Sequence, residues 1–298
     1  MLSIVIPSYL GHIRHIERFL ISNAKHNKDI DNTNIYIIIS YEEKEIFTSV
    51  TSKFKNVHIL IFKDLMLKYF DINIENETTF LLEIGSFSFQ SLKKLVGMLD
   101  CKDETIFIVD SETYFIRDCE VISECNKTET VLYSKILNND FQEKACDITK
   151  KILELDYDPP LTGYVFSYQW IFKKIDVQNF FNKYKNNIIN NTIKTTFTLF
   201  FIELVILYYC LKNSFSYKFI DATDILSYTN TEHFWMNAKN NEKDKEAINK
   251  LLSVHNLFCY SIQNNWNDPL LNENNTNILN DFKNFKILTN TPQQITII

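Results

Sequence analysis

The chain has 298 residues, with 31 Lys plus Arg against 37 Asp plus Glu and a formal net charge of −6. Hydrophobic residues make up 45% and charged residues 23%, a composition that excludes wholly disordered, collagen-like and coiled-coil proteins. The acidic balance argues against a nucleic-acid-binding protein, because such proteins usually carry a basic excess. Length alone permits one large domain or two small ones.

Glycine and cysteine usage exclude further classes. The chain has only four glycines and contains neither GxGxxG nor GxxxxGK[ST], which disfavours Rossmann dehydrogenases, P-loop ATPases and protein kinases. Its six cysteines form no CxxC pair, so a zinc ribbon is not expected. No basic, apolar leader precedes them, and we therefore predict reduced cysteines in a cytoplasmic protein.

The first part of the chain alternates between two kinds of pattern. Short apolar runs predict buried strands at 2–7, 34–40, 57–62 and 105–109. Helical spacing of apolar residues predicts helices at 12–26, 42–51 and 87–99. Apolar strands that alternate with helices indicate an α/β fold, with a mostly parallel sheet covered by helices on both faces.

The second half is less regular and more helical. We expect a turn at 156–160, helices at 177–187, 195–212 and 244–252, and short strands at 217–220 and 254–262. The most apolar stretch, 197–211, is too short to span a bilayer and contains Glu203, so it predicts a buried helix. No Gly-, Ser- or Pro-rich linker divides the chain, which favours one domain over 1–298.

Polar residues follow three of the predicted strands, in Pro7-Ser8-Tyr9, in Ser40-Tyr41-Glu42-Glu43 and in Asp110-Ser111-Glu112. Open α/β sheets bind ligands at the carboxyl ends of their strands. If the chain stays extended after 105–109, Asp110 and Glu112 project to the same face. Two hard oxygen ligands there suit Mg²⁺ or Mn²⁺, with diphosphate oxygens completing the coordination.

These segments resemble the nucleotide-sugar glycosyltransferases of the GT-A fold. The segment 4–9 looks like their opening strand and nucleotide-binding loop, and 105–112 like the strand that delivers their DxD motif, here as DSE. The segment 89–95 resembles the preceding helix of bacterial and viral capsule or lipooligosaccharide transferases. The resemblance implies a nucleotide-sugar-binding half over 1–120 and an acceptor-side half over 121–298.

The resemblance also implies roles for particular residues. Asp110 and Glu112 would hold the metal with His255, and Asp110 would also be catalytic together with Glu203, a carboxylate in an apolar helix. Because Lys93 and Lys94 are adjacent, we expect only one of them to reach the donor. The full set of expected donor contacts is Pro7, Ser8, Tyr9, Glu42, Gln90, Lys93, Lys94, Ser111 and Gly163.

The sequence thus predicts a metal-dependent enzyme that moves a sugar from a nucleotide-sugar, with UDP-sugars favoured, to a glycan or lipid-linked glycan. Peripheral contact with a membrane stays open, and the oligomeric state is not predicted. Two alternatives also stay open. One is a catalytically inactive GT-A-like binding or assembly protein, and the other is a different α/β nucleotide-dependent transferase. Metal-dependent nucleotide binding would separate the enzyme from the inactive protein.

Overall fold

The protein is described from a computed structural model that covers residues 1–115, 118–126, 130–133, 139–156, 170–195, 198–213, 218–221 and 259–261. Its main sheet has the strand order β3-β2-β1-β4-β7. These strands are β1 (Leu2–Pro7), β2 (Thr33–Ile39), β3 (Val57–Ile61), β4 (Thr105–Ile108) and β7 (Trp170–Lys173). The first four run parallel, and β7 pairs antiparallel with β4. The predicted mostly parallel sheet is therefore confirmed.

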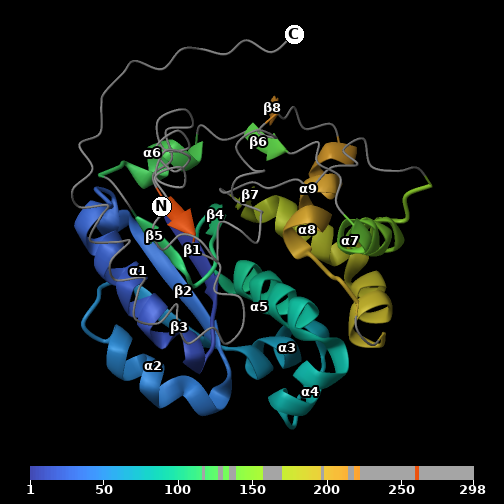
Figure 1. Ribbon diagram of the computed structural model, residues 1–298, viewed down its shortest axis with the longest axis horizontal. Helices are drawn as coiled ribbons and strands as arrows, with labels where there is room; N and C mark the ends of the chain where they lie inside the picture. The colour runs from blue at the N-terminus through green and yellow to red at the C-terminus, as the bar shows by residue number, and fades with distance from the viewer. Residues whose placement is uncertain are drawn as a thin grey trace.

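Helices cover both faces of this sheet (Figure 1). One face packs against α1 (Ile13–His26) and α2 (Lys44–Thr51). The other packs against a larger group: α3 (Phe62–Phe70), α4 (Glu77–Ile84), α5 (Ser86–Asp100), α7 (Asn139–Leu153), α8 (Lys174–Ile188) and α9 (Ile202–Lys212). Short 3-10 turns η1 (Leu10–His12), η2 (Ile30–Asn32) and η3 (Tyr41–Glu43) and a π-helical turn η4 (Ile189–Ile193) flank these helices.

The apolar strand sequences explain why the sheet is buried on both faces. On β1, Ile4 and Ile6 lie in the core under α1 and α2, whereas Val5 lies in the core under α5. Successive strand residues point to opposite faces, so an uninterrupted apolar run supplies both layers at once. Helix α5 lies across β1 and β2 at this position, and its Lys93 and Lys94 are both buried.

Two small sheets accompany the main one. Strand β5 (Thr113–Phe115) pairs antiparallel with β9 (Cys259–Ser261), and β6 (Thr130–Tyr133) pairs parallel with β8 (Lys218–Asp221), while α6 (Val121–Asn126) lies between β5 and β6 in the chain. Through this pairing, residues 259–261, late in the sequence, lie beside the segment that follows Asp110. Part of the predicted strand at 254–262 is thus confirmed.

Some predicted elements differ from the structure. Helices α3, α4 and α7 were not expected, and the helix predicted at 195–212 begins only at Ile202, since Phe201 is extended with φ −115° and ψ 94°. The helix predicted at 244–252 lies outside the described residues. None of the described helices combines the length and the apolar character needed to cross a bilayer.

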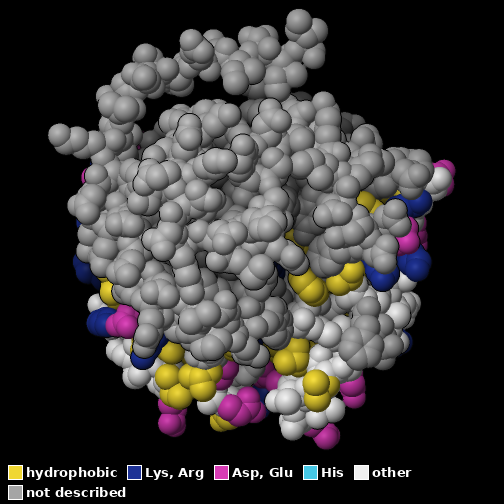
Figure 2. Space-filling view, in the orientation of Figure 1, with side chains coloured by type: hydrophobic (Ala, Val, Ile, Leu, Met, Phe, Trp, Pro, Cys, Tyr) yellow, Lys and Arg dark blue, Asp and Glu magenta, His cyan; other side chains and the backbone are white. Residues whose placement is uncertain are grey.

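Charged side chains of both signs occur on the described surface. Figure 2 shows Lys and Arg side chains next to Asp and Glu side chains along the described part of one face, with apolar side chains between them. This part of the face therefore carries charges of both signs close together. The expected lack of nucleic-acid binding stays a prediction.

Candidate functional site

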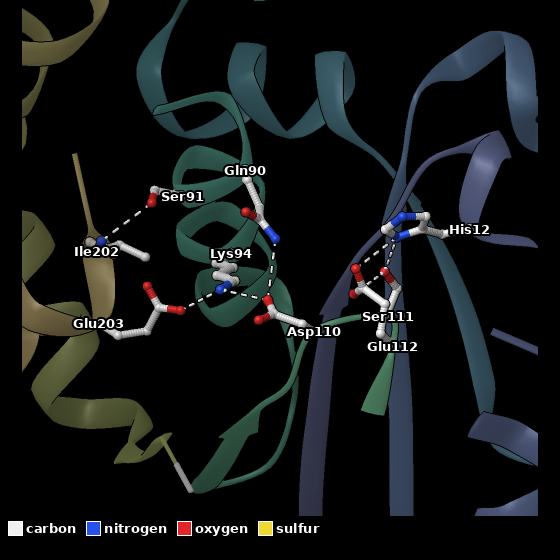
Figure 3. A network of polar contacts seen from close by, with 9 residues as sticks. All are labelled: His12, Gln90, Ser91, Lys94, Asp110, Ser111, Glu112, Ile202 and Glu203. Carbon is white, nitrogen blue, oxygen red and sulfur yellow. Dashed lines mark hydrogen bonds and ion pairs between the residues drawn. The ribbon is translucent and has the colours of Figure 1, made fainter. Parts of the chain in front are cut away.

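Asp110 lies two residues beyond β4, at the carboxyl edge of the parallel strands, and faces α5 (Figure 3). Its Oδ1 atom lies 2.9 Å from Lys94 Nζ. The same oxygen accepts a hydrogen bond from Gln90 Nε2 at 3.2 Å. The Asp110 side chain is 30% exposed, so one end of it is tied to α5 and part of it faces solvent. Three predicted site residues thus meet at the predicted strand end.

Lys94 also forms an ion pair with Glu203 Oε1 on α9. The side chains of Lys94 and Glu203 are 7% and 1% exposed. Burial lowers the pKa of Lys94, but Asp110 and Glu203 outweigh this effect and raise it above its ordinary value. Lys94 is therefore an ammonium at neutral pH. Two carboxylates surround one ammonium, which gives this Asp110–Lys94–Glu203 group a formal charge of −1.

Two hydrogen bonds fix α9 against α5 and so place Glu203. Ser88 Oγ donates to the carbonyl oxygen of Thr198 at 2.7 Å, and Ser91 Oγ accepts from the backbone N–H of Ile202 at 3.4 Å. The second bond satisfies one of the N–H groups that have no partner within the first turn of a helix. The start of α9 and the segment before it are therefore held against α5, and α9 starts at the position that directs Glu203 to Lys94.

Ser111 and Glu112 belong to a turn that is closed by a hydrogen bond from Thr113 N–H to the Asp110 carbonyl at 3.0 Å. Ser111 Oγ donates to Glu112 Oε2 at 3.0 Å and lies 2.5 Å from His12 Nδ1. Because the Ser111 hydroxyl donates to Glu112, the His12 tautomer that completes this chain is protonated at Nδ1. Burial, with His15 beside it, lowers the His12 pKa to about 4 against the opposing effect of Asp110.

This turn changes the predicted metal site. The chain does not stay extended after β4, so the two carboxylates have different neighbours: Asp110 contacts α5, and Glu112 lies 3.6 Å from His12 Nδ1. The expectation that both project to one face is wrong for this reason. The residual negative charge beside Asp110 suits a cation, but the described residues include no group of three His, Cys, Asp or Glu able to hold one. His255 lies outside the described residues, and the metal stays a prediction.

The loops after β1 and β2 hold the other predicted donor contacts. Pro7 ends β1, and the carbonyl oxygen of Ser8 accepts from Lys93 Nζ at 2.9 Å. Lys93 and Lys94 therefore both contact predicted site residues, and the expectation that only one of them reaches the donor stays a prediction. The Tyr9 ring is 49% exposed and lies 4.2 Å, centroid to centroid, from the His12 ring.

Glu42 is exposed, and its neighbour Glu43 makes the contacts that join the two loops. Glu43 Oε1 accepts from Leu10 N–H at 2.6 Å, and its Oε2 accepts from Ser40 N–H at 3.1 Å. Ser40 and Glu43 form a capping box, a pattern that is readable from their spacing, so this residue could have been found from the sequence. Gly163 lies outside the described residues.

Comparison with known proteins gives fold neighbours only. No family model matches the sequence, and none of the curated proteins matches it significantly. An active-site mutant of the galactosyltransferase LgtC is 10% identical, with 98% of each chain covered and a TM-score of 0.49. Mouse xyloside xylosyltransferase 1 is 9% identical, with 74% of this chain and 84% of that chain covered and a TM-score of 0.44.

A third neighbour is 4-diphosphocytidyl-2C-methyl-D-erythritol synthase from Anaerococcus prevotii, 12% identical, with 74% of this chain and 88% of that chain covered and a TM-score of 0.41. Two of these three neighbours are glycosyltransferases, the class that the sequence resembles. At these identities and TM-scores, no activity and no site residue is assigned from the likeness.

Proposed function

We propose that the protein is a glycosyltransferase that moves a sugar from a nucleotide-sugar to a glycan or lipid-linked glycan. The observation that carries the proposal is the Asp110–Lys94–Glu203 group, which lies with Gln90 at the carboxyl edge of the parallel strands. Ligands of open α/β sheets bind at this edge. The sequence resemblance over 4–9, 89–95 and 105–112 supports the same reaction, with residues 1–120 on the donor side and 121–298 on the acceptor side.

The contacts support a distinct role for each member of the group. Lys94 holds Oδ1 of Asp110, and the exposed part of this carboxylate can accept a hydrogen bond from a hydroxyl of the donor sugar. Gln90 donates to the same Oδ1 and so fixes the side chain from a second direction. These contacts already restrict the Asp110 side chain before a ligand binds. Binding a hydroxyl therefore costs little further conformational entropy, which is the effect of preorganisation.

In the proposed reaction, an acceptor hydroxyl oxygen forms a bond to the anomeric carbon of the donor sugar. The bond from that carbon to the diphosphate oxygen breaks, and the nucleoside diphosphate leaves with the bonding electrons. The hydroxyl proton passes to a base, which the sequence predicts to be Glu203. The full burial of Glu203 and its ion pair with Lys94 support a positioning role instead, in which it holds Lys94 against Asp110.

The predicted Mn²⁺ or Mg²⁺ and the preference for a UDP-sugar are finer parts of this proposal. A cytoplasmic reaction, with peripheral contact to a membrane that carries a lipid-linked acceptor, is also part of it. When bound, a divalent cation neutralises charge on the leaving diphosphate. Asp110, whose side chain is 30% exposed, offers such an ion a hard oxygen ligand.

A thermal-shift panel tests the proposal. UDP-, GDP-, CMP- and ADP-sugars are each added with Mn²⁺ and with EDTA. A ligand at a hundred times its Kd stabilises the native state by about 2.7 kcal/mol, or roughly 5 °C for a chain of this size. We expect one nucleotide to give this shift. Asp110→Asn should abolish it, and Asp64→Asn, the same change at an exposed position on α3, should not.

The panel and one rate assay also separate the alternatives. A shift that appears only with Mn²⁺ supports the cation, whereas an equal shift in EDTA removes it from the proposal. No shift with any nucleotide would overturn the proposed function in favour of an inactive fold. For Glu203→Gln, a base role predicts a loss of kcat together with a loss of the acidic, low-pH limb of its pH profile. A positioning role predicts a weaker donor affinity with that limb retained.

A further inference from the structure

A second polar cluster lies at the ends of β1 and β2. Ser8 follows β1, Glu77 is the first residue of α4, and Lys93 lies on α5. Their exposed fractions are 4%, 6% and 3%. We call this set the Ser8–Glu77–Lys93 cluster. Glu77 was not singled out from the sequence, because no local pattern distinguishes it from other acidic residues.

Backbone contacts fix the cluster to two neighbouring strands. Lys93 Nζ donates to the carbonyl oxygen of Ser8 at 2.9 Å, just beyond β1. Tyr41 N–H donates to Glu77 Oε1 at 3.3 Å, just beyond β2. Burial lowers the pKa of Lys93, and Glu43 and Glu77 oppose this effect, so both carboxylates lie within electrostatic reach of the ammonium. Lys93 and Glu77 therefore form one charged group, which is anchored to the Ser8 backbone.

Two atoms of the cluster have unused hydrogen-bonding capacity. Glu77 Oε2 and Ser8 Oγ are buried, and neither has a hydrogen-bond partner among the described residues. Buried polar atoms in native proteins are almost always paired, so these two atoms require an explanation. A carboxylate can only accept, an ammonium can only donate, and a hydroxyl can do both. The cluster therefore matches a ligand with a donor group next to an oxygen acceptor.

Uridine and guanosine have this pattern twice, in the ring N–H beside a base carbonyl and in the ribose hydroxyls, whereas cytidine and adenosine have it in the ribose hydroxyls. Tyr9 and Tyr41, on the loops that hold the cluster, are 49% and 52% exposed and offer aromatic faces to a base. Tyr41 is held by Lys63 Nζ, 3.8 Å from its ring centroid. These aromatic faces favour a nucleoside over a simple polyol.

We propose that Glu77 recognises the nucleoside of the donor by accepting a hydrogen bond from one of its N–H or O–H groups. Lys93 and Ser8 donate to neighbouring oxygens of the same nucleoside. This inference rests on the proposed function and names the residue that recognises the nucleoside. It assigns Glu77 to nucleoside recognition and leaves sugar transfer to the group around Asp110.

Calorimetric titration of the full chain with UDP, GDP, CDP and ADP tests the inference. The variant is Glu77→Gln, whose amide oxygen can keep the bond from Tyr41 N–H while its NH₂ replaces the accepting Oε2. The matched control is Glu83→Gln, the same change at an exposed position of α4. We expect Glu77→Gln to weaken the affinity for the bound nucleotide about ten- to a hundredfold, and Glu83→Gln to leave this affinity unchanged.

Two analogues of the bound nucleotide identify the donor atom. One carries an N-methylated base and lacks the ring N–H, and the other is a 2′-deoxynucleotide. The analogue that lacks the recognised group should bind wild type weakly and should bind Glu77→Gln no worse than the parent nucleotide does. A purely structural Glu77 would not change this discrimination. The unfolding midpoint of each variant without ligand checks that it folds.

The outcomes separate the two proposals. If wild type binds a nucleotide and Glu77→Gln binds it as tightly as Glu83→Gln does, the role of Glu77 is overturned and the proposed function stands. The role of Glu77 is also overturned if wild type binds both analogues as well as the parent. If wild type binds none of the four diphosphates, the proposed function fails, and the role of Glu77 fails with it.

Discussion

Replacing Lys94 by methionine tests the buried charge group directly. The substitution keeps the length of the side chain but removes the only cation that pairs with Glu203 among the described residues, and Glu203 is 1% exposed. Breaking a buried ion pair by removing one partner typically costs about 3–5 kcal/mol, because the remaining charge stays buried without compensation. A native protein of this kind is stable by about 5–15 kcal/mol, so we expect Lys94→Met to remove a large share of its stability.

The structure also predicts how a second substitution changes this cost. In Glu203→Leu, Lys94 still pairs with Asp110 at 2.9 Å, so we expect a smaller loss of about 1–3 kcal/mol. In the double variant, Lys94→Met with Glu203→Leu, two apolar side chains replace the buried pair, and Asp110 stays 30% exposed to solvent. Such replacements are often neutral, so the double variant should be more stable than Lys94→Met alone.

Urea unfolding at pH 7, followed by circular dichroism, measures these free energies. Lys68→Met is the matched control, since Lys68 pairs with Asp100 while its own side chain is 59% exposed, and such pairs contribute about 1 kcal/mol or less. The reasoning is refuted if Lys94→Met costs no more than Lys68→Met. It is also refuted if the loss in the double variant equals the sum of the two single losses.

Two further predictions concern α5. Burial lowers the pKa of Lys93 from 10.5 to about 8. Between these two pH values, the folded state therefore binds fewer protons than the unfolded state. Stability relative to Lys93→Met should therefore rise by about 3 kcal/mol from pH 8 to 10.5 in urea unfolding, whereas a constant difference would contradict the burial. In Gly97→Ala, the new Cβ would lie 2.6 Å from Ile38 Cδ1, and this overpacking should cost about 1–3 kcal/mol, which exceeds the helix-propensity gain of about 1 kcal/mol. Adding Ile38→Val, which removes that atom, should recover part of the lost thermal stability. If it recovers none, the strain does not arise from the contact with Ile38.

The sequence by itself determined the α/β half of the molecule. Uninterrupted apolar runs such as 2–7 and 34–40 predicted buried strands, because a strand covered on both faces needs apolar residues on both of its faces. Of the missed helices, α3 continues directly from β3 without a turn between them, whereas α4 carries local signals that were overlooked: Asn76 caps its start, and Gly85, with φ 84°, follows its end. Their positions depend on packing against α5, which a local pattern does not report.

The sequence also pointed to the candidate site by its strand ends and its lysine-bearing helix. Asp110, Lys94 and Glu203 were all singled out, but their contacts join residues 16 and 109 positions apart, and no spacing rule connects them. Only the tertiary structure decided that Lys94 pairs with both carboxylates. It also decided that Glu112 turns to His12 and that Glu77 lies within electrostatic reach of Lys93. Local sequence sets strand and helix formation, whereas charge pairing at a sheet edge depends on how distant segments pack.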